Sequence, residues 1–310
     1  MTAQQITYLV FGIVLLIAIA FDLGLLSRKN KVISIRQALF QTLFWVLLAM
    51  SFFVFIWIED GEVLAFQYLS GYLMEWSLSI DNIFVFILIF SSFAVKEKYY
   101  GQVLLIGILM AVIFRVVFIT VGVALVNKFE WILYIFGAFL VYTGIKMFSA
   151  KEEKEFDPHQ SKVYKFLNRF LPLVPHDGNG RYIIREHKRP AYTTLFVVVI
   201  MLAMTDLVFA FDSIPAVMGI SRDKMVIYTS NIFAVLGLRS MFFLLRGAVN
   251  RFEYLQQGIA IVLVFIGLKM LAEIFHFTVP IYISLMVIVV CLGGSIIYSL
   301  QAAAKKATKE

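Results

Sequence analysis

The residues of this sequence that could do chemistry are two pairs of carboxylates inside long apolar runs. Glu75 and Asp81 lie six residues apart in GYLMEWSLSIDNIFVF, and Asp206 and Asp212 lie six residues apart in LAMTDLVFAFDSIPAV. An acid at the centre of a bilayer costs roughly 2.5 to 3.5 kcal/mol even on lenient insertion scales, so four acids require a compensating partner. The simplest partner is a cation, and the pattern therefore favours a metal-ion transporter.

Side chains close to these acids supply further oxygen atoms. Asn82 and Ser213 directly follow the second acid of each pair, and Ser79 and Thr205 are further candidate ligands. Carboxylate, amide and hydroxyl oxygens, with no His or Cys nearby, suit hard divalent ions such as Mn²⁺, Mg²⁺ or Ca²⁺ better than Zn²⁺ or Cu⁺. The predicted ligands of the transported ion are Glu75, Asp81, Asn82, Asp206, Asp212 and Ser213.

The spacing of the acids has a geometric consequence for the helices that carry them. On an unbroken helix, Glu75, Ser79 and Asn82 share one face, whereas Asp81 points about 120° away. Both acids of a pair can face one site only if the helix is distorted. The length of the third apolar run and the position of Pro215 shortly after Asp212 favour such a distortion, and an unwound turn would also free backbone carbonyls as ligands.

Composition places these acids in a membrane. The chain is 61% hydrophobic and only 15% charged, and its apolar residues fall in runs near the length that spans a bilayer. Its one cysteine, Cys291, excludes disulfides within the chain and a cysteine-based metal cage. We therefore predict an all-α polytopic membrane protein with about nine transmembrane helices. Their approximate ranges are 6–27, 37–58, 63–95, 101–126, 130–149, 191–219, 226–249, 254–275 and 279–300.

Basic residues indicate the orientation of these spans. The loops on one side hold nearly all of the loop lysines and arginines, and the loops on the other side hold only Lys128, Arg222 and Lys224. The positive-inside rule then predicts a multi-pass protein of the inner (cytoplasmic) membrane, with the N-terminus outside and the C-terminus in the cytoplasm. The formal charge of +7 is thus a topology signal, and the spread of basic residues over loops predicts no nucleic-acid partner.

Four basic residues inside or near the spans repeat along the chain. Arg115 and Arg239 are 124 residues apart, and Lys146 and Lys269, in GIKM and GLKM, are 123 apart; the acidic pairs recur after 131. Spans three to five and six to eight therefore resemble two copies of a three-helix unit, and an odd number of crossings inserts the second copy upside down. The predicted organisation is two N-terminal helices (1–62), a first repeat (63–149), a cytoplasmic linker (150–190), a second repeat (191–275) and a last helix with a basic tail (276–310).

Other interpretations of the acids remain open. They could serve only as structural partners of the four basic residues, which we otherwise expect to neutralise the empty site or to gate it. Paired acids could also form the acid/base dyad of an intramembrane hydrolase, although the inverted repeat favours alternating access without catalytic residues or a cofactor. Crowded carboxylates would favour H⁺ as the coupling ion of an antiporter. The linker, with its partly amphipathic stretch, could instead mark an accessory protein that delivers metal to secreted enzymes.

Four long strings carry a resemblance to a known family. EWSLSIDNIFVF, DLVFAFDSIPAV, EWILYIFGAF and YTSNIFAVLGLRSMFFLL resemble the TerC family of integral membrane proteins, in particular its Alx-like branch within the LysE-type transporter superfamily. The resemblance covers about residues 5–300. It implies export of Mn²⁺ from the cytoplasm, and it places the family's acidic motif positions on the six predicted ligands.

One position departs from the family pattern. The family usually has a Glu three residues before the acid at Asp206, as in E-L-S-D, and this chain has Ala203 in A-M-T-D. The missing carboxylate lowers the negative charge of the site. Either the ion is bound more weakly, an oxygen such as that of Thr205 compensates, or transport is impaired.

Overall fold

The computed structural model describes residues 3–26, 33–149, 160–186, 189–246, 254–275, 277 and 279–307. The side chains of residues 3, 4, 21–26, 81, 149 and 303–307 lie outside this description. The described chain is helical apart from one short hairpin, as predicted for an all-α membrane protein. The long helices are α1 (Ala3–Leu26), α2 (Ile35–Glu59), α3 (Glu62–Ser92), α4 (Glu97–Lys128), α5 (Ile132–Ser149), α7 (Thr194–Ile220), α8 (Lys224–Leu245), α9 (Leu255–Ala272) and α10 (Ile281–Ala307).

Local sequence accounts for several helix ends. Ser34 and Gln37 form a capping box at the start of α2, and the Asp223 carboxylate accepts hydrogen bonds from two backbone amides at the start of α8. Gly61 separates α2 from α3 with φ at 93°, a conformation that few other residues adopt. These helix ends fall at polar residues or glycines that interrupt the apolar runs. The predicted spans match the observed helices for this reason.

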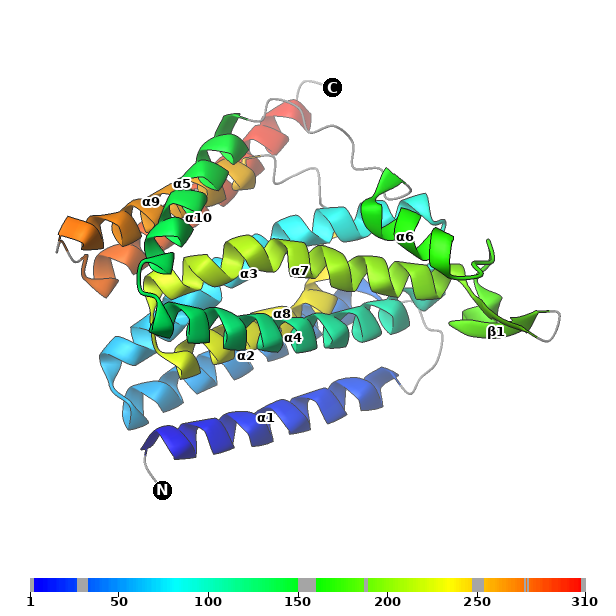
Figure 1. Cartoon of the computed structure of the whole chain (residues 1–310), viewed down its shortest axis with the longest axis horizontal. Coiled ribbons are helices and arrows are strands. Elements are labelled where there is room, and N and C mark those ends of the chain that lie inside the picture. Colours follow the sequence, from blue (N-terminus) through cyan, green and yellow to red (C-terminus); the bar gives the residue numbers. More distant parts are fainter. Residues whose placement is uncertain are drawn as a thin grey trace.

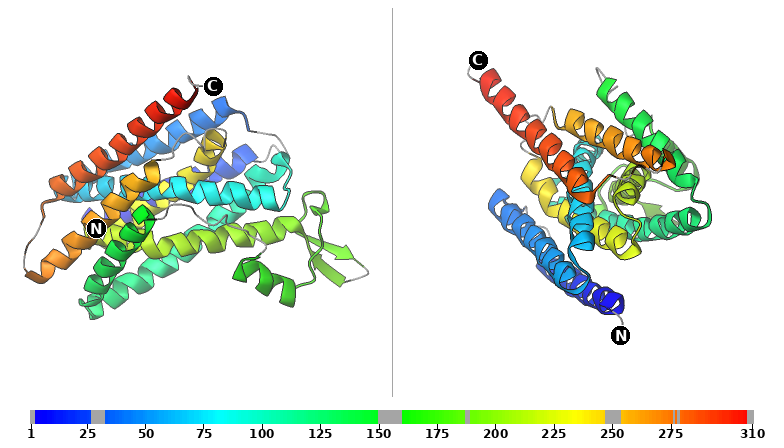
Figure 2. Two further views of the ribbon diagram at one scale, coloured as in Figure 1. Left: turned by 90° about the horizontal axis from the view of Figure 1, so that it is seen from above. Right: turned by 90° about the vertical axis from the view of Figure 1, so that its left-hand side faces the viewer.

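Seven of the described helices are long and apolar enough to cross a membrane, and two shorter apolar helices cover 5–20 and 132–148. The predicted number of nine crossings therefore stays a prediction. Helices α3, α4, α7 and α8 lie together at the centre of the molecule; α1 and α2 cover one side, and α5, α9 and α10 gather on another (Figures 1 and 2). Helix α8 is the most enclosed of the candidate spans, with 94% of its apolar window buried, whereas that of α4 is 44% buried.

Helix pairing follows a reciprocal pattern. Helix α3 packs against α8, and α4 packs against α7. An inverted repeat that relates α3–α5 to α7–α9 would give this exchange, but the repeat itself stays a prediction. The third helices of the two units, α5 and α9, cross with their backbones almost in contact: a Cβ added to Gly267 would lie 2.6 Å from the carbonyl oxygen of Gly137.

The linker between α5 and α7 folds against one end of the bundle (Figure 1). It contains a short helix, α6 (Lys162–Phe170), and an antiparallel hairpin of β1 (Ile183–Glu186) and β2 (Arg189–Tyr192). The sequence predicted an amphipathic surface helix here but not the hairpin. Four-residue strands that are mostly exposed leave almost no hydrophobic periodicity for a sequence argument to find.

Contacts between loops agree with the predicted alternation of sides. The Lys96 ammonium lies 2.6 Å from the Asp177 carboxylate, which joins the α3–α4 turn to the linker. That hydrogen bond raises the pKa of Lys96 and lowers the pKa of Asp177. At the other end of the bundle, the Thr7 hydroxyl donates to Asp60 at 2.7 Å. Which end faces the cytoplasm stays a prediction.

Candidate functional site

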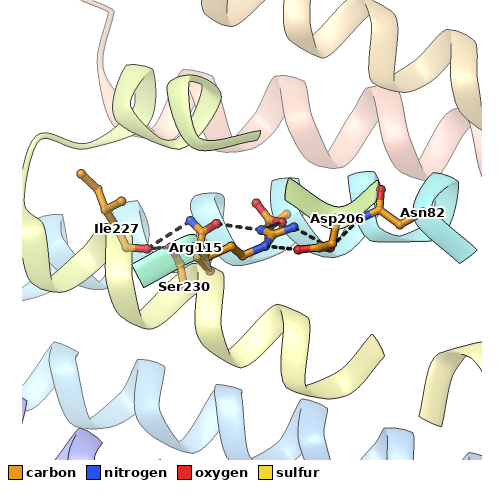
Figure 3. Close-up of polar contacts among 7 residues, drawn as sticks. Asn82, Arg115, Asp206, Ile227 and Ser230 are labelled. Carbon is orange, nitrogen blue, oxygen red and sulfur yellow. Dashed lines mark hydrogen bonds and ion pairs between the residues drawn. The ribbon is translucent and has the colours of Figure 1, made fainter. Parts of the chain in front are cut away.

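A buried polar cluster lies where α3, α4, α7 and α8 meet, and Arg115 of α4 is at its centre (Figure 3). The Arg115 side chain is fully buried. Its guanidinium contacts the carboxylates of Glu75 on α3 and Asp206 on α7, and it donates to the amide oxygen of Asn231 on α8 at 3.1 Å. One cation therefore holds side chains from three other helices.

Asp206 is the most completely bonded acid of this cluster. Arg115 donates to its two carboxylate oxygens through Nε at 2.7 Å and Nη2 at 3.0 Å, the two-pronged geometry that makes an arginine–carboxylate pair strong. The Asn82 side-chain amide donates a third hydrogen bond at 3.2 Å. The buried negative charge of Asp206 is thus matched by a fixed positive charge and an amide dipole.

Glu75 is bonded through only one of its oxygens. Its Oε1 accepts from Nη1 of Arg115, whereas Oε2 finds no hydrogen-bond partner among the side chains that the structure describes. Ser213 of α7 lies beside this carboxylate. The hydroxyl of Ser79 and the amide oxygen of Asn82 are likewise buried without a partner within the described part of the chain. An unpaired buried polar group costs about 1 to 3 kcal/mol, so these oxygens call for a ligand or water.

The predicted helical face is confirmed. Glu75, Ser79 and Asn82 are all buried, and Glu75 and Asn82 reach the same Arg115–Asp206 pair from α3. The expectation of an unwound turn is wrong, because α3 and α7 are continuous, with Pro215 accommodated inside α7. The bundle brings Glu75 and Asp206 together from two different helices, so no break is needed for two acids to meet.

Asp212, the second acid of the second pair, is placed differently from Asp206. Asp212 is half-buried and accepts a hydrogen bond from Thr143 of α5 at 3.3 Å, so it faces α5 and stands apart from the Arg115 cluster. The side chain of Asp81 lies outside the described residues. Among the side chains that are described, no three His, Cys, Asp or Glu residues gather closely enough to hold a metal ion.

The other predicted residues surround the cluster or lie away from it. Arg239 is buried in α8 beside an apolar cavity lined by Trp45 and Leu236, while Lys146 is exposed and Lys269 half-buried. Of the predicted charge partners, Arg115 forms ion pairs with two of the predicted acids, Glu75 and Asp206.

Thr205 and Ala203, which precede Asp206 on α7, differ in how deeply they are buried. Thr205 is half-buried, and no hydrogen bond of its hydroxyl is seen within the described part of the molecule. Ala203 is fully buried one helical turn before Asp206, on the same face of α7. A longer acidic side chain at this position would point into the protein interior and not into lipid.

Asn231 is the member of the cluster that the sequence did not identify as part of the site. Its amide nitrogen donates to the Ile227 carbonyl one turn earlier in the same helix, α8, at 3.1 Å. Its amide oxygen instead accepts from Arg115. The available signal was a fully buried amide on α8, the helix that packs against α3.

Fold and site together define a polytopic α-helical membrane protein with an ionised cluster in its interior. The chain belongs to the integral membrane protein TerC family, whose model matches residues 60–308. It is 42% identical over 282 residues to the uncharacterized membrane protein STKORF319 of Myxococcus xanthus, covering 91% of this chain and 88% of that protein. It is 39% identical over 289 residues to Alx of Escherichia coli (strain K12), covering 90% and 89%, for which a role as a membrane-bound redox modulator has been suggested. No solved structure matches the chain significantly.

Proposed function

We propose that this protein is a divalent-cation transporter that exports Mn²⁺ from the cytoplasm across the inner membrane by alternating access. The proposal assigns no catalytic residue and no cofactor, and Mn²⁺ is its substrate. The observation that carries it is the pair of buried carboxylates, Glu75 and Asp206, which α3 and α7 present to each other inside the bundle. Ionised groups in the membrane interior are costly and usually mark an ion path.

The oxygens around these carboxylates support a hard cation as the ligand. Glu75, Ser79 and Asn82 each have a buried oxygen without a hydrogen-bond partner among the described side chains, and the Ser213 hydroxyl lies beside Glu75. Carboxylate, hydroxyl and amide oxygens are the donors that Mn²⁺, Mg²⁺ and Ca²⁺ prefer. A purely structural ion pair would not need this set of unpaired oxygen atoms.

Arg115 has a defined part in the proposed cycle. In this conformation its guanidinium forms ion pairs with the carboxylates of Glu75 and Asp206, so it neutralises the acids when no metal ion is bound. A divalent ion that binds the same carboxylates must displace Arg115, because like charges repel strongly at such short distances in a low dielectric. Exchange of the Arg115 guanidinium for the transported ion would link ion binding to movement of α4, the helix that carries Arg115.

Asp212 and Thr143 would form a separate point on the ion path. They lie between α7 and α5, away from the Arg115 cluster, and Asp212 is only half-buried. A half-buried carboxylate can bind an ion that still keeps part of its water shell. Asp81, six residues from Glu75, would do the same on α3. Protons are the proposed counter-ions, since an empty pair of carboxylates gains from protonation when the metal has left.

A redox function, as suggested for the relative Alx, has less support in this chain. The sequence contains one cysteine, so it cannot form a dithiol or disulfide pair within one molecule. Metal export could alter the redox balance of a cell indirectly through the supply of metal to enzymes. The proposed metal export is therefore compatible with the redox role suggested for Alx.

The test is Mn²⁺ flux into proteoliposomes that hold the purified chain. Glu75→Gln and Asp206→Asn should each reduce flux at least tenfold, because each removes a charge from the site. Glu130→Gln is the matched control: it neutralises an exposed acid in the α4–α5 loop and should leave flux unchanged. Equal flux in all four proteins would refute the proposed site. Mg²⁺ and Ca²⁺ as competitors would rank the ions.

Ala203→Glu extends the same assay. It restores the carboxylate that the family usually has one turn before Asp206, at a fully buried position. If the parent is slow because the site lacks this charge, the variant should carry more Mn²⁺ at low concentration. Unchanged or lower flux in the variant would show that the alanine does not limit transport.

A further inference from the structure

Helix α6 has two faces of different character. Val163, Tyr164 and Leu167 turn toward the bundle, and the Tyr164 ring lies 5.5 Å from the ring of Phe93 at the end of α3. The exposed flank beside this inward face carries two large aromatic side chains, Phe166 and Phe170, which are 60% and 63% exposed. A nine-residue helix is only about 13 Å long and cannot cross a membrane, so this exposed apolar surface is not explained by a transmembrane span.

The position of α6 is fixed relative to the end of a span. At its beginning, the Ser161 hydroxyl contacts the Met201 sulfur, two turns inside α7, at 3.6 Å. After its end, the backbone of Pro172 accepts from Tyr192, just before α7 begins. Helix α6 therefore runs along the first two turns of α7 (Figure 2). Since α7 is about 40 Å long and the hydrocarbon layer about 30 Å thick, α7 exceeds the layer by about 10 Å and its first turns can lie at headgroup level.

Basic residues share the outward face with the phenylalanines. At 100° per residue, Lys162, Lys165 and Arg169 fall within an arc of about 60°, and Phe166 and Phe170 occupy the adjoining arc. All five side chains are exposed. The two rings lie 4.7 Å apart and the Arg169 guanidinium lies 5.7 Å from the Phe170 ring, so the aromatic and basic groups form one continuous surface.

We propose that this outward face of α6 binds the anionic phospholipid headgroups of the adjoining leaflet. Phe166 and Phe170 enter the boundary between headgroups and acyl chains, and the three basic residues bind lipid phosphates. The charge of the face complements an anionic leaflet, and the rings fit the zone where aromatic side chains gather at membrane surfaces. This inference does not depend on metal transport.

The test measures lipid binding to the full-length protein in neutral detergent. Cys291→Ser with Asn168→Cys places one thiol on the exposed part of α6 for an environment-sensitive fluorophore. Phosphatidylglycerol should shift the emission to shorter wavelength with a saturable dependence, and phosphatidylcholine should not. Each basic residue near an anionic surface contributes roughly fivefold to affinity, so replacing Lys162, Lys165 and Arg169 with Gln should raise the half-saturating concentration on the order of 100-fold.

A matched variant separates a specific surface from general charge. Replacing Arg185 and Arg189 of the neighbouring hairpin and Arg181 just before it with Gln removes three exposed positive charges and should leave the response within about threefold of the parent. Equal losses in the two triple variants would overturn the proposal. A similar shift with free inorganic phosphate in place of lipid would also overturn it, because phosphate alone cannot receive the phenylalanine rings.

Discussion

The Arg115–Asp206 pair makes a quantitative prediction about stability. Arg115→Gln would leave Glu75 and Asp206 buried without their shared cation. Removing one partner of a buried ion pair costs about 3 to 5 kcal/mol, because the remaining charge is uncompensated. Asp206→Asn keeps the shape of the side chain but loses two charge-assisted hydrogen bonds from Arg115, at 2.7 and 3.0 Å, and should cost about 2 to 3 kcal/mol.

The double variant distinguishes a real pair from two independent effects. Arg115→Gln together with Asp206→Asn removes one charge of each sign, so its cost should be smaller than the sum of the single costs by about 2 to 3 kcal/mol. The free energy of unfolding of the four proteins is measured in mixed micelles by denaturing-detergent titration. The same cycle on Arg246 and Glu97, an exposed pair at 3.3 Å, serves as the control and should give a coupling of at most about 1 kcal/mol.

Additivity would refute the reasoning. If the two single costs sum to the double cost within about 0.5 kcal/mol, Arg115 and Asp206 do not interact in the membrane-embedded protein. The proposal that Arg115 neutralises Glu75 and Asp206 when no metal ion is bound would then be refuted as well. Coupling above 1.5 kcal/mol, with the weak value at the surface pair, would place the buried pair in the resting conformation.

Three further predictions use the same preparations. The Lys96–Asp177 contact lowers the pKa of Asp177 and raises the pKa of Lys96. Its contribution to stability should therefore be full between about pH 4 and 10.4. The contribution should be lost as pH falls through the lowered pKa of Asp177, and also as pH rises through the raised pKa of Lys96. Asp177→Asn should therefore lower the thermal midpoint at pH 7 but not at pH 2, and a pH-independent difference would contradict this. Gly267→Ala should destabilise by about 1 to 3 kcal/mol because its Cβ meets backbone atoms, whereas Gly293→Ala, with nothing within 4 Å, should be neutral or stabilising by up to about 1 kcal/mol; equal effects would show that the close crossing is absent. Asp212→Asn should cost at least about 1 kcal/mol less than Asp206→Asn, since it loses one hydrogen bond of 3.3 Å and no ion pair, and the reverse order of unfolding free energies would refute the separate placement of the two acids.

Much of the fold was predictable because its causes are local. Apolar runs broken by features such as Gly61 and Asp223 mark helix ends directly, and the alternation of basic loops agrees with the contact between Lys96 and Asp177. The hairpin was not predictable, because its short exposed strands depend on packing at the end of the bundle. Helix continuity through Pro215 also depends on neighbouring helices that the sequence does not reveal.

The site was predictable in its residue types but less so in its pairing. The spacing of Glu75, Ser79 and Asn82 gave the correct buried face, since helical periodicity is enough to place them. The pairing of Arg115 with Glu75 and Asp206 follows from how α4 packs against α7, which is long-range information. The separation of Asp212 from Asp206 was implied by the same 100° rule that separated Asp81 from Glu75, but the expected helix distortion obscured it.

The close crossing of α5 and α9 constrains any motion that opens the bundle. Because Gly137 and Gly267 bring two backbones together without side chains between them, the helices have no compressible layer along which to slide. If the two predicted units move while this contact is kept, one turns against the other about an axis through it. Displacement would be smallest near the glycines and would grow with distance from them. Such a pivot would turn a small change of angle at α5 and α9 into a larger separation of α3 from α7, the helices that hold Glu75 and Asp206.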